Sequence, residues 1–357
     1  MKRSMVLSRC GVSLLAWVAL AACGHDPAVV GASEEAPAST APVVANSAPV
    51  VAVAPSASSA QAEPPAAPVL PDGLLASPER TAPLDVDKDG AQACPAGMLL
   101  VDGDYCPGLA ENCLEWAKVR DPSAKGVAQR CLRFAPKSRC LGPTQHRRFC
   151  IDEFEYPNLR GVKPAVMVDW YDALRACDTE GKRLCLASEW TLACEGREWL
   201  PYPYGYVRDK RVCNFDRPRP EPEPRFNDFA YPRKIAAEVS RLDMRVASGV
   251  LQGCVSPFGV HDMTGNVDEW VINEDHFNPV GGEKPPFVSG LKGGYWGPIR
   301  ARCRPMTTSH QEVFRFYQVG FRCCADALDH PDGVADTYVR QLGRWREHEG
   351  LAPLPQK

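Results

Sequence analysis

The number of cysteines constrains the fold of this chain more than any other sequence feature. Fourteen of the sixteen cysteines lie between Cys94 and Cys324, while Cys10 and Cys23 stand near the start of the chain. An even number of cysteines in an exported protein predicts a disulfide framework, because thiols persist as pairs in an oxidising compartment. A zinc site would need close clusters such as two CxxC units, and the sequence contains none. Spacing alone leaves the pairing of so many cysteines open.

The first residues predict a signal peptide that ends at a lipidation site. Three basic residues precede the apolar run 11–22, which is too short to span a bilayer as a helix. The run ends in Leu20-Ala-Ala-Cys23, the pattern at which bacterial lipoproteins are cleaved and acylated. We therefore expect Cys23 to be the lipidated N-terminus, with an ordinary secretory signal as the alternative. Gly24, rather than Asp, at the next position favours an outer-membrane location, facing the periplasm or the cell surface.

Residues 23–90 predict a tether between this anchor and the folded part of the chain. The composition is dominated by Ala, Pro, Val and Ser, which cannot bury a core. Proline favours extended conformations, so we expect a flexible to semi-rigid spacer without chemistry. At its end, Asp85-Val-Asp-Lys-Asp-Gly90 resembles half of an EF-hand loop, but Ala96 stands where the closing acid belongs. We interpret this segment as a solvated acidic turn, with a calcium loop as the alternative.

The balance of charged residues argues against a nucleic-acid-binding protein, and the length of the cysteine-rich region favours one folded domain. The chain has 41 Lys and Arg against 44 Asp and Glu, and no basic cluster lies beside aromatic residues, so nucleic acid is not an expected partner. Residues 91–326 suffice for a single domain with its own core. In the tail, residues 327–357, an apolar helical face predicts a short helix packed on the domain or, alternatively, bound to a partner. This face comprises Val334, Tyr338, Leu342 and Trp345.

Three segments near the C-terminus, and a helical block before them, occur in an order that identifies a family. The segments are Gly259-Val-His-Asp-Met-Thr-Gly-Asn-Val-Asp-Glu-Trp270, Lys292-Gly-Gly-Tyr-Trp296 and Val319-Gly-Phe-Arg-Cys-Cys324. The block comprises the segment 166–177, Gly181-Lys-Arg-Leu184, and a second helix that begins near Ser188. In the first segment, helical spacing of the residues Trp170, Ala173, Leu174 and Cys177 predicts a helix. Together they resemble the formylglycine-generating (sulfatase-modifying factor) family over most of residues 95–325. The stretch 216–253 departs from the family, and its prolines at 218–224 predict an extended surface excursion.

The resemblance implies the fold and two of the disulfide bonds. The implied fold is an irregular, disulfide-rich α+β domain of the C-type-lectin-like kind, with a few short antiparallel strands. By position in the family motifs, Cys177 would bond to Cys323 and Cys194 to Cys303. The adjacent Cys323 and Cys324 are most simply interpreted as two bridges that diverge from one strand, whose side chains alternate between faces.

Catalytic members of the family carry a second pair of cysteines that binds copper(I) and oxidises a substrate cysteine to formylglycine. The corresponding interval here, Gly297-Pro-Ile-Arg-Ala-Arg302, contains no cysteine and is several residues shorter. Cys303 and Cys324 are the weak candidates for replacing that pair. We therefore expect no copper and no catalytic residues, and interpret the domain as a silent member that keeps the scaffold.

The resemblance also implies calcium on the Gly-Asn turn, through the side chains of Asp262 and Glu269 and the carbonyl groups of Gly265 and Val267. Two carboxylates and two carbonyls form the hard-oxygen set that calcium prefers. In the alternative interpretation both carboxylates cap backbone amides of the turn. A weaker second calcium site would begin at Asn214-Phe215.

Other polar and aromatic residues point to structural roles. The seven histidines lack HxxxH or HxH spacing, so no imidazole metal site is expected. Trp270 and Trp296 are expected to anchor the core, and Arg322 to form a buried ion pair.

Two functional hypotheses follow. The first is a lipid-anchored envelope protein whose domain binds a protein or glycan without oxidising it. The second is a copper-dependent oxidase that acts on a cysteine of sulfatases.

Overall fold

The computed structural model describes residues 93–118, 130–226, 231–277 and 285–348, all within one compact unit. The predicted signal peptide, Cys23, the tether and the acidic turn at 85–90 lie outside the described residues. Within the described part of the chain, no helix is both long enough and apolar enough to cross a membrane.

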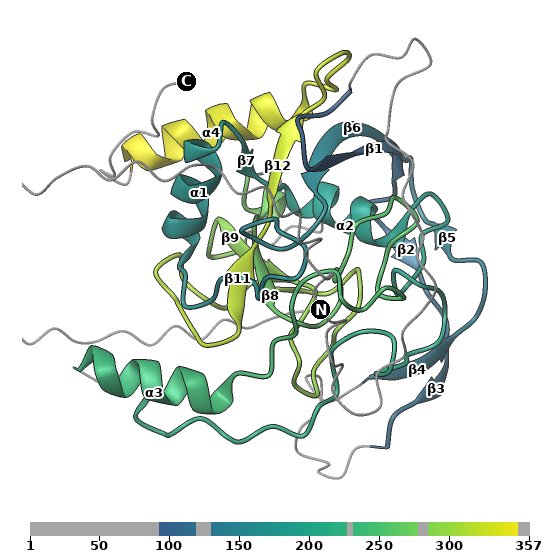
Figure 1. Cartoon of the computed structure of the whole chain (residues 1–357). Helices are drawn as coiled ribbons and strands as arrows, with labels where there is room; N and C mark the ends of the chain where they lie inside the picture. Colours follow the sequence, from purple (N-terminus) through teal and green to yellow (C-terminus); the bar gives the residue numbers. More distant parts are fainter. Residues whose placement is uncertain (1–92, 119–129, 227–230, 278–284, 349–357) are drawn as a thin grey trace, which may run out of the picture. The chain divides into compact units, whose positions relative to one another are not determined.

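Two four-stranded sheets form the centre of the domain (Figure 1). The first has the order β1-β6-β12-β7 and is antiparallel throughout. The second has the order β10-β9-β8-β11, in which only β11 runs parallel to its neighbour β8. The strands of the first sheet are β1 (Met98–Tyr105), β6 (Gln145–Asp152), β12 (Cys323–Asp326) and β7 (Arg183–Leu184). Those of the second are β10 (Met306–Thr307), β9 (Ser289–Lys292), β8 (Asp268–Ile272) and β11 (Val319–Phe321).

One residue, Arg322, joins the two sheets along the chain. It follows β11 of the second sheet and precedes β12 of the first. Both strands are short, with three residues in β11 and four in β12, which agrees with the predicted fold of few and short strands. The position also places the arginine between the two layers, where it is fully buried.

The two predicted helices are α1 (Trp170–Thr179) and α2 (Ala187–Glu195). The side chain of Asp169 caps α1 by accepting a hydrogen bond from the Asp172 amide at 2.8 Å. Helical spacing turns one face of α1 into the core, and α2 is buried along almost its whole length. Trp170 donates to the Val271 carbonyl at 3.0 Å, which ties α1 to β8.

The tail forms the predicted helix, α4 (Val334–His348), which lies beside α1 (Figure 1). Ala335 and Leu342 are buried in the same core cluster as Trp170, and the Trp345 ring meets the Trp170 ring edge-on. The apolar face of α4 therefore packs on its own domain.

The excursion at 216–253 contains a helix that sequence analysis did not find. Residues 217–223 form neither helix nor strand, which agrees with the prolines, but α3 (Pro232–Leu242) follows them. Its apolar positions, Ile235, Val239 and Leu242, contact a core cluster that also contains Trp296. A short 3-10 helix, η2 (Glu274–His276), follows β8.

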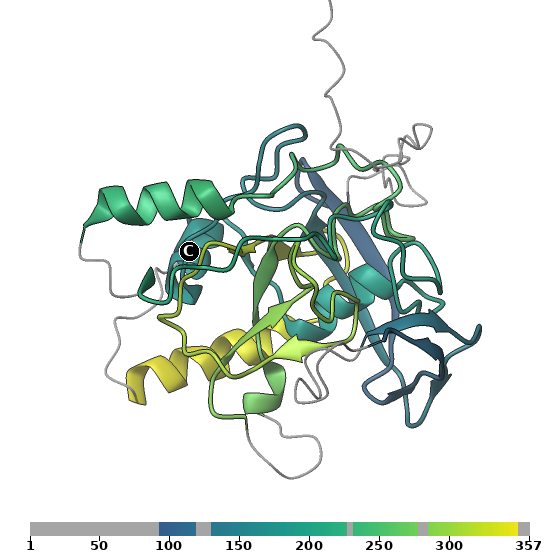
Figure 2. The same cartoon turned by 90° about the horizontal axis from the view of Figure 1, so that it is seen from below.

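Two small two-stranded sheets stand apart from α1 and α4, at the far side of the domain in both views (Figures 1 and 2). They pair β2 (Leu109–Ala110) with β5 (Arg139–Cys140), and β3 (Cys113–Trp116) with β4 (Cys131–Phe134). The Cys106–Cys140 bond lies beside the β2–β5 pair, and the Cys113–Cys131 bond joins β3 to β4.

All fourteen cysteines from Cys94 onward are paired in seven disulfide bonds. Cys177 is bonded to Cys323 and Cys194 to Cys303, the two pairs that the resemblance implies. Cys324 is bonded to Cys185, so the adjacent cysteines of β12 do diverge to two partners. The remaining bonds are Cys106–Cys140 and Cys113–Cys131 at the two small sheets, together with Cys94–Cys150 and Cys213–Cys254.

Candidate functional site

The Gly-Asn turn lies directly before β8 and has a strained backbone. Asp262, Gly265 and Asn266 all have positive φ angles, of 59°, 86° and 56°. Asp and Asn tolerate this left-handed conformation better than other side chains, and Gly adopts it freely. The turn is completely buried, and the Asn266 amide donates to the Asn214 carbonyl at 2.9 Å.

A buried ion pair holds this turn against the junction of the two sheets. The guanidinium of Arg322 donates to both carboxylate oxygens of Glu269, at 2.7 and 2.8 Å. It also donates to the His261 carbonyl at 2.9 Å. The Trp190 indole donates to the same Glu269 carboxylate at 2.7 Å. Arg322 therefore has the structural role that sequence analysis gave it.

Two further carboxylates, Glu155 and Asp262, lie in the electrostatic range of the same arginine. Burial raises the pKa of Asp262 to about 7, against the effects of the Gly249 amide and Arg322. Burial, followed by the charges of Asp262 and Glu269, raises the pKa of Glu155 well above its usual value. The positive charge of Arg322 thus interacts with three buried carboxyl groups, of which Glu269 alone is hydrogen-bonded to it. Sequence analysis missed Glu155.

The predicted calcium ligands are engaged in other contacts in this arrangement. Asp262 caps a backbone amide, accepting from Gly249 at 2.7 Å, while its second oxygen is buried without a partner. Both oxygens of Glu269 accept from Arg322. Within the described residues, no group of three or more His, Cys, Asp or Glu side chains could hold a metal ion. Calcium here stays a prediction, and binding through Glu269 would require its carboxylate to turn away from Arg322.

The weaker second calcium site is also occupied by internal contacts. The Asn214 side-chain amide donates to the Met244 carbonyl at 2.9 Å and to the Asn266 side chain at 3.1 Å. The ring of Phe215 lies 4.4 Å from the guanidinium carbon of Arg208. These contacts join the predicted second site to the Gly-Asn turn as parts of one buried network.

The cysteine-free interval 297–302 leads into the disulfide-bonded Cys303. Trp296, which precedes the interval, is fully buried in the aromatic cluster that includes Tyr317. Copper(I) requires thiolate ligands, and all fourteen described cysteines are disulfide-bonded. The weak candidates Cys303 and Cys324 are bonded to Cys194 and Cys185. The residues present therefore do not fit a copper(I) centre.

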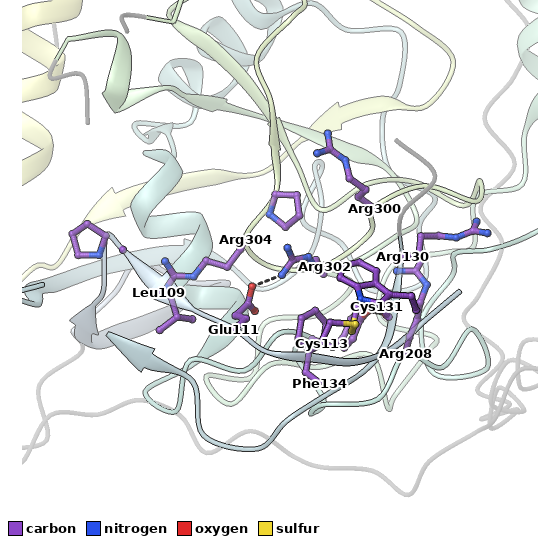
Figure 3. A pocket seen from close by; sticks show the side chains of 15 residues that line it. Leu109, Glu111, Cys113, Arg130, Cys131, Phe134, Arg208, Arg300, Arg302 and Arg304 are labelled. Carbon is purple, nitrogen blue, oxygen red and sulfur yellow. Dashed lines mark hydrogen bonds and ion pairs between the residues drawn. A yellow bond between two sulfur atoms is a disulfide. The ribbon is translucent and has the colours of Figure 1, made fainter. Parts of the chain in front are cut away.

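An arginine-lined cavity of about 650 Å³ lies beside this interval. Figure 3 shows the Glu111–Arg302 ion pair within its lining, with Arg304 on one side, Arg130 and Arg208 on the other, and Arg300 above. Sequence analysis missed this cavity. The alternation of arginine at 300, 302 and 304 was the available signal, but the hairpin that completes the cavity could not be placed from the sequence.

Most of the cavity arginines have carboxylate partners. Arg208 donates to both oxygens of Asp216, at 2.7 and 3.0 Å, and Arg130 contacts the same carboxylate at 3.2 Å. Arg304 donates to Glu195 at 2.6 Å. Five guanidinium groups thus face three carboxylates, and among the described residues Arg300 has no hydrogen-bond or ion-pair partner.

Two curated proteins are similar to about half of this chain. Both are named serine/threonine-protein kinase pkn1, from Chlamydia caviae and Chlamydia pneumoniae. They are 27% identical over 180 residues and 25% identical over 178 residues, covering 49% of this chain and 23% of each relative. The chain thus spans less than a quarter of the length of these relatives.

Two solved structures show limited overall likeness. CarF is 15% identical, with a TM-score of 0.39, over 65% of this chain and 98% of that one. PvdO from Pseudomonas aeruginosa is 16% identical, with a TM-score of 0.36, over 64% of this chain and 93% of that one.

The family comparison covers more than half of the chain. The model of the sulfatase-modifying factor enzyme 1-like domain matches residues 141–327, from just before β6 to just after β12. It includes both helices of the predicted block, the Gly-Asn turn and the Arg322 junction. The fold is therefore the expected formylglycine-generating-enzyme-like α+β fold, and the chain belongs to the family of the sulfatase-modifying factor enzyme 1-like domain.

Proposed function

We propose that this domain is a non-oxidising member of its family that binds a protein or glycan partner in the cell envelope. The proposal is carried by one observation, the state of the cysteines around the position of the family's copper centre. Cys303 is bonded to Cys194, and the six residues before it include no cysteine. The domain thus keeps the scaffold and lacks the thiolates that the oxidation requires.

The binding role is supported by the arginine-lined cavity, which lies beside the interval 297–302, where catalytic members of the family carry their copper-binding thiols. Arg300 and Arg302 of this interval, and Arg304 after it, line an open cavity. Ligand-binding sites are usually concave and combine apolar or aromatic lining with a few convergent polar groups. The lipid anchor at Cys23 and the tether after it stay predictions, and they would hold this cavity away from the membrane surface.

The oxidase is the alternative, and a peptide assay separates the two functions. We expect the full-length chain, supplied with copper(I), oxygen and a thiol reductant, to leave a Cys-x-Pro-x-Arg peptide unchanged. Mass spectrometry would detect conversion to formylglycine as a change in peptide mass, and a catalytically competent family member serves as the positive control. Conversion above the rate without protein would contradict the proposed function.

A further inference from the structure

The cavity beside residues 297–302 combines a fixed wall, an excess of positive charge and an exposed aromatic ring. We propose that it binds an acidic carbohydrate, with a sugar ring on Trp116 and a carboxylate or sulfate group in the field of the arginines. This inference rests on the proposed binding function and names the class of ligand.

One wall of the cavity comes from residues that precede the segment matched by the family model. Strands β3 and β4 supply Trp116 and Phe134, and the opposite side is formed by residues 300–305. The Cys113–Cys131 bond joins the two strands, and the Cys106–Cys140 bond holds the neighbouring β2–β5 pair. Because these bonds restrict the wall, little ordering is required when a ligand enters. One wall of the site therefore lies outside the segment that the family model matches, and the other lies within it.

The charge of the lining selects an anion. Its five arginines are opposed by three carboxylates, Glu111, Asp216 and Glu195, which leaves an excess of two positive charges. Arg300 is exposed and has no partner among the described residues. Arg302 keeps 28% of its side chain exposed beside Glu111. A guanidinium binds carboxylate and sulfate groups through paired hydrogen bonds, so these two arginines are the expected anion contacts.

The aromatic residues favour a sugar over a small inorganic anion. Trp116 lines the cavity with 56% of its surface exposed. An exposed indole supplies a flat apolar face together with a polar N–H group, which suits a ring that has an apolar face and polar edges. The volume of about 650 Å³ lies within the range of pockets that hold small organic ligands.

Calorimetric titration of the purified full-length chain tests this inference. The probes are trigalacturonate, its neutral methyl ester, a heparin tetrasaccharide and a Glu-rich hexapeptide. We expect one trigalacturonate per chain, with weaker binding at higher salt, and at least tenfold weaker binding of the ester. The heparin arm distinguishes a preference for sulfate from a preference for carboxylate, and tight binding of either acidic sugar supports the proposal.

Three variants locate the site. Arg300→Gln should weaken binding of the acidic sugar about tenfold, and Trp116→Ala should weaken it by a similar factor. Arg233→Gln, at an exposed arginine on α3 outside the cavity, should change nothing. Unchanged melting temperatures would show that all three variants fold. Binding that survives both cavity substitutions would overturn the proposed site.

The assignment of an acidic carbohydrate as the ligand and the proposed non-oxidising function can each be contradicted by a different result. If neither acidic sugar bound, or if the hexapeptide bound more tightly than both, the carbohydrate assignment would be wrong. Conversion of the cysteine peptide in the oxidase assay would instead remove the non-oxidising function, whatever the sugars did. The two results come from different measurements, so each failure can be recognised alone.

Discussion

Replacing Arg322 by Met should destabilise the domain by about 3 to 5 kcal/mol, the range found when one partner of a buried ion pair is removed. The guanidinium is fully buried and gives two hydrogen bonds to Glu269 and one to the His261 carbonyl. Without it, the Glu269 carboxylate would stay buried beside Asp262 and Glu155 with no compensating charge. Urea unfolding at pH 7 measures the change.

A double-mutant cycle distinguishes this pair from general damage to the core. Glu269→Gln in the Arg322→Met background should restore part of the lost stability, because it removes the uncompensated charge. Arg233→Met, at an exposed position, should leave the unfolding midpoint unchanged. An additive cycle, with each single substitution costing less than about 1 kcal/mol, would contradict the role of the pair.

The same variant examines the calcium prediction. Arg322→Met removes the guanidinium from both oxygens of Glu269, so that Oε2 keeps only the Trp190 indole as a donor and Oε1 becomes available to a cation, as is the unpartnered oxygen of Asp262. If the turn takes calcium, the ion should raise the melting temperature of the variant more than that of the unmodified chain, because only the native state presents the ligands. Equal melting temperatures with calcium and with chelator in both proteins would exclude the site.

Substituting Gly265 by Ala should cost at least about 3 kcal/mol, combining left-handed strain with a steric clash. The φ angle of Gly265 is 86°, and a Cβ there would lie 2.3 Å from the Asn214 carbonyl oxygen. That oxygen is backbone and accepts from the Asn266 amide, so it cannot move without breaking the turn.

The matched control is Gly343→Ala in α4. A Cβ at Gly343 meets no atom within 4 Å, and a helical glycine is less stable than alanine by about 1 kcal/mol. The two substitutions should therefore shift the unfolding midpoint in opposite directions. A Gly265→Ala variant as stable as the unmodified chain would show that the turn has another conformation.

Much of the fold could be predicted because the family motifs coincide with positions that backbone geometry and burial constrain. The apolar spacing of Trp170 and Leu174 defined α1. The adjacent pair Cys323 and Cys324 pointed to two diverging bridges because strand side chains alternate between faces.

Other features depend on contacts between distant segments. Helix α3 was missed although Ile235, Val239 and Leu242 have helical spacing, because it lies in the stretch without family resemblance and directly follows a proline-rich segment. Arg322 interacts with the carboxyl groups of Glu269, Asp262 and Glu155, and Glu155 lies 167 positions before it in the chain. No local sequence pattern predicts such a long-range interaction. The arginine-lined cavity likewise appears only when β3 and β4 fold against residues 300–305.

Copper(I) titration of the full-length chain, against a chromophoric chelator, tests the non-oxidising character of the domain most directly. With Cys303 bonded to Cys194 and no cysteine in 297–302, the chain should leave the copper with the chelator at every ratio. Binding of one copper(I) per chain, lost on Cys303→Ser substitution, would contradict this account and make the shortened interval a rebuilt oxidase site.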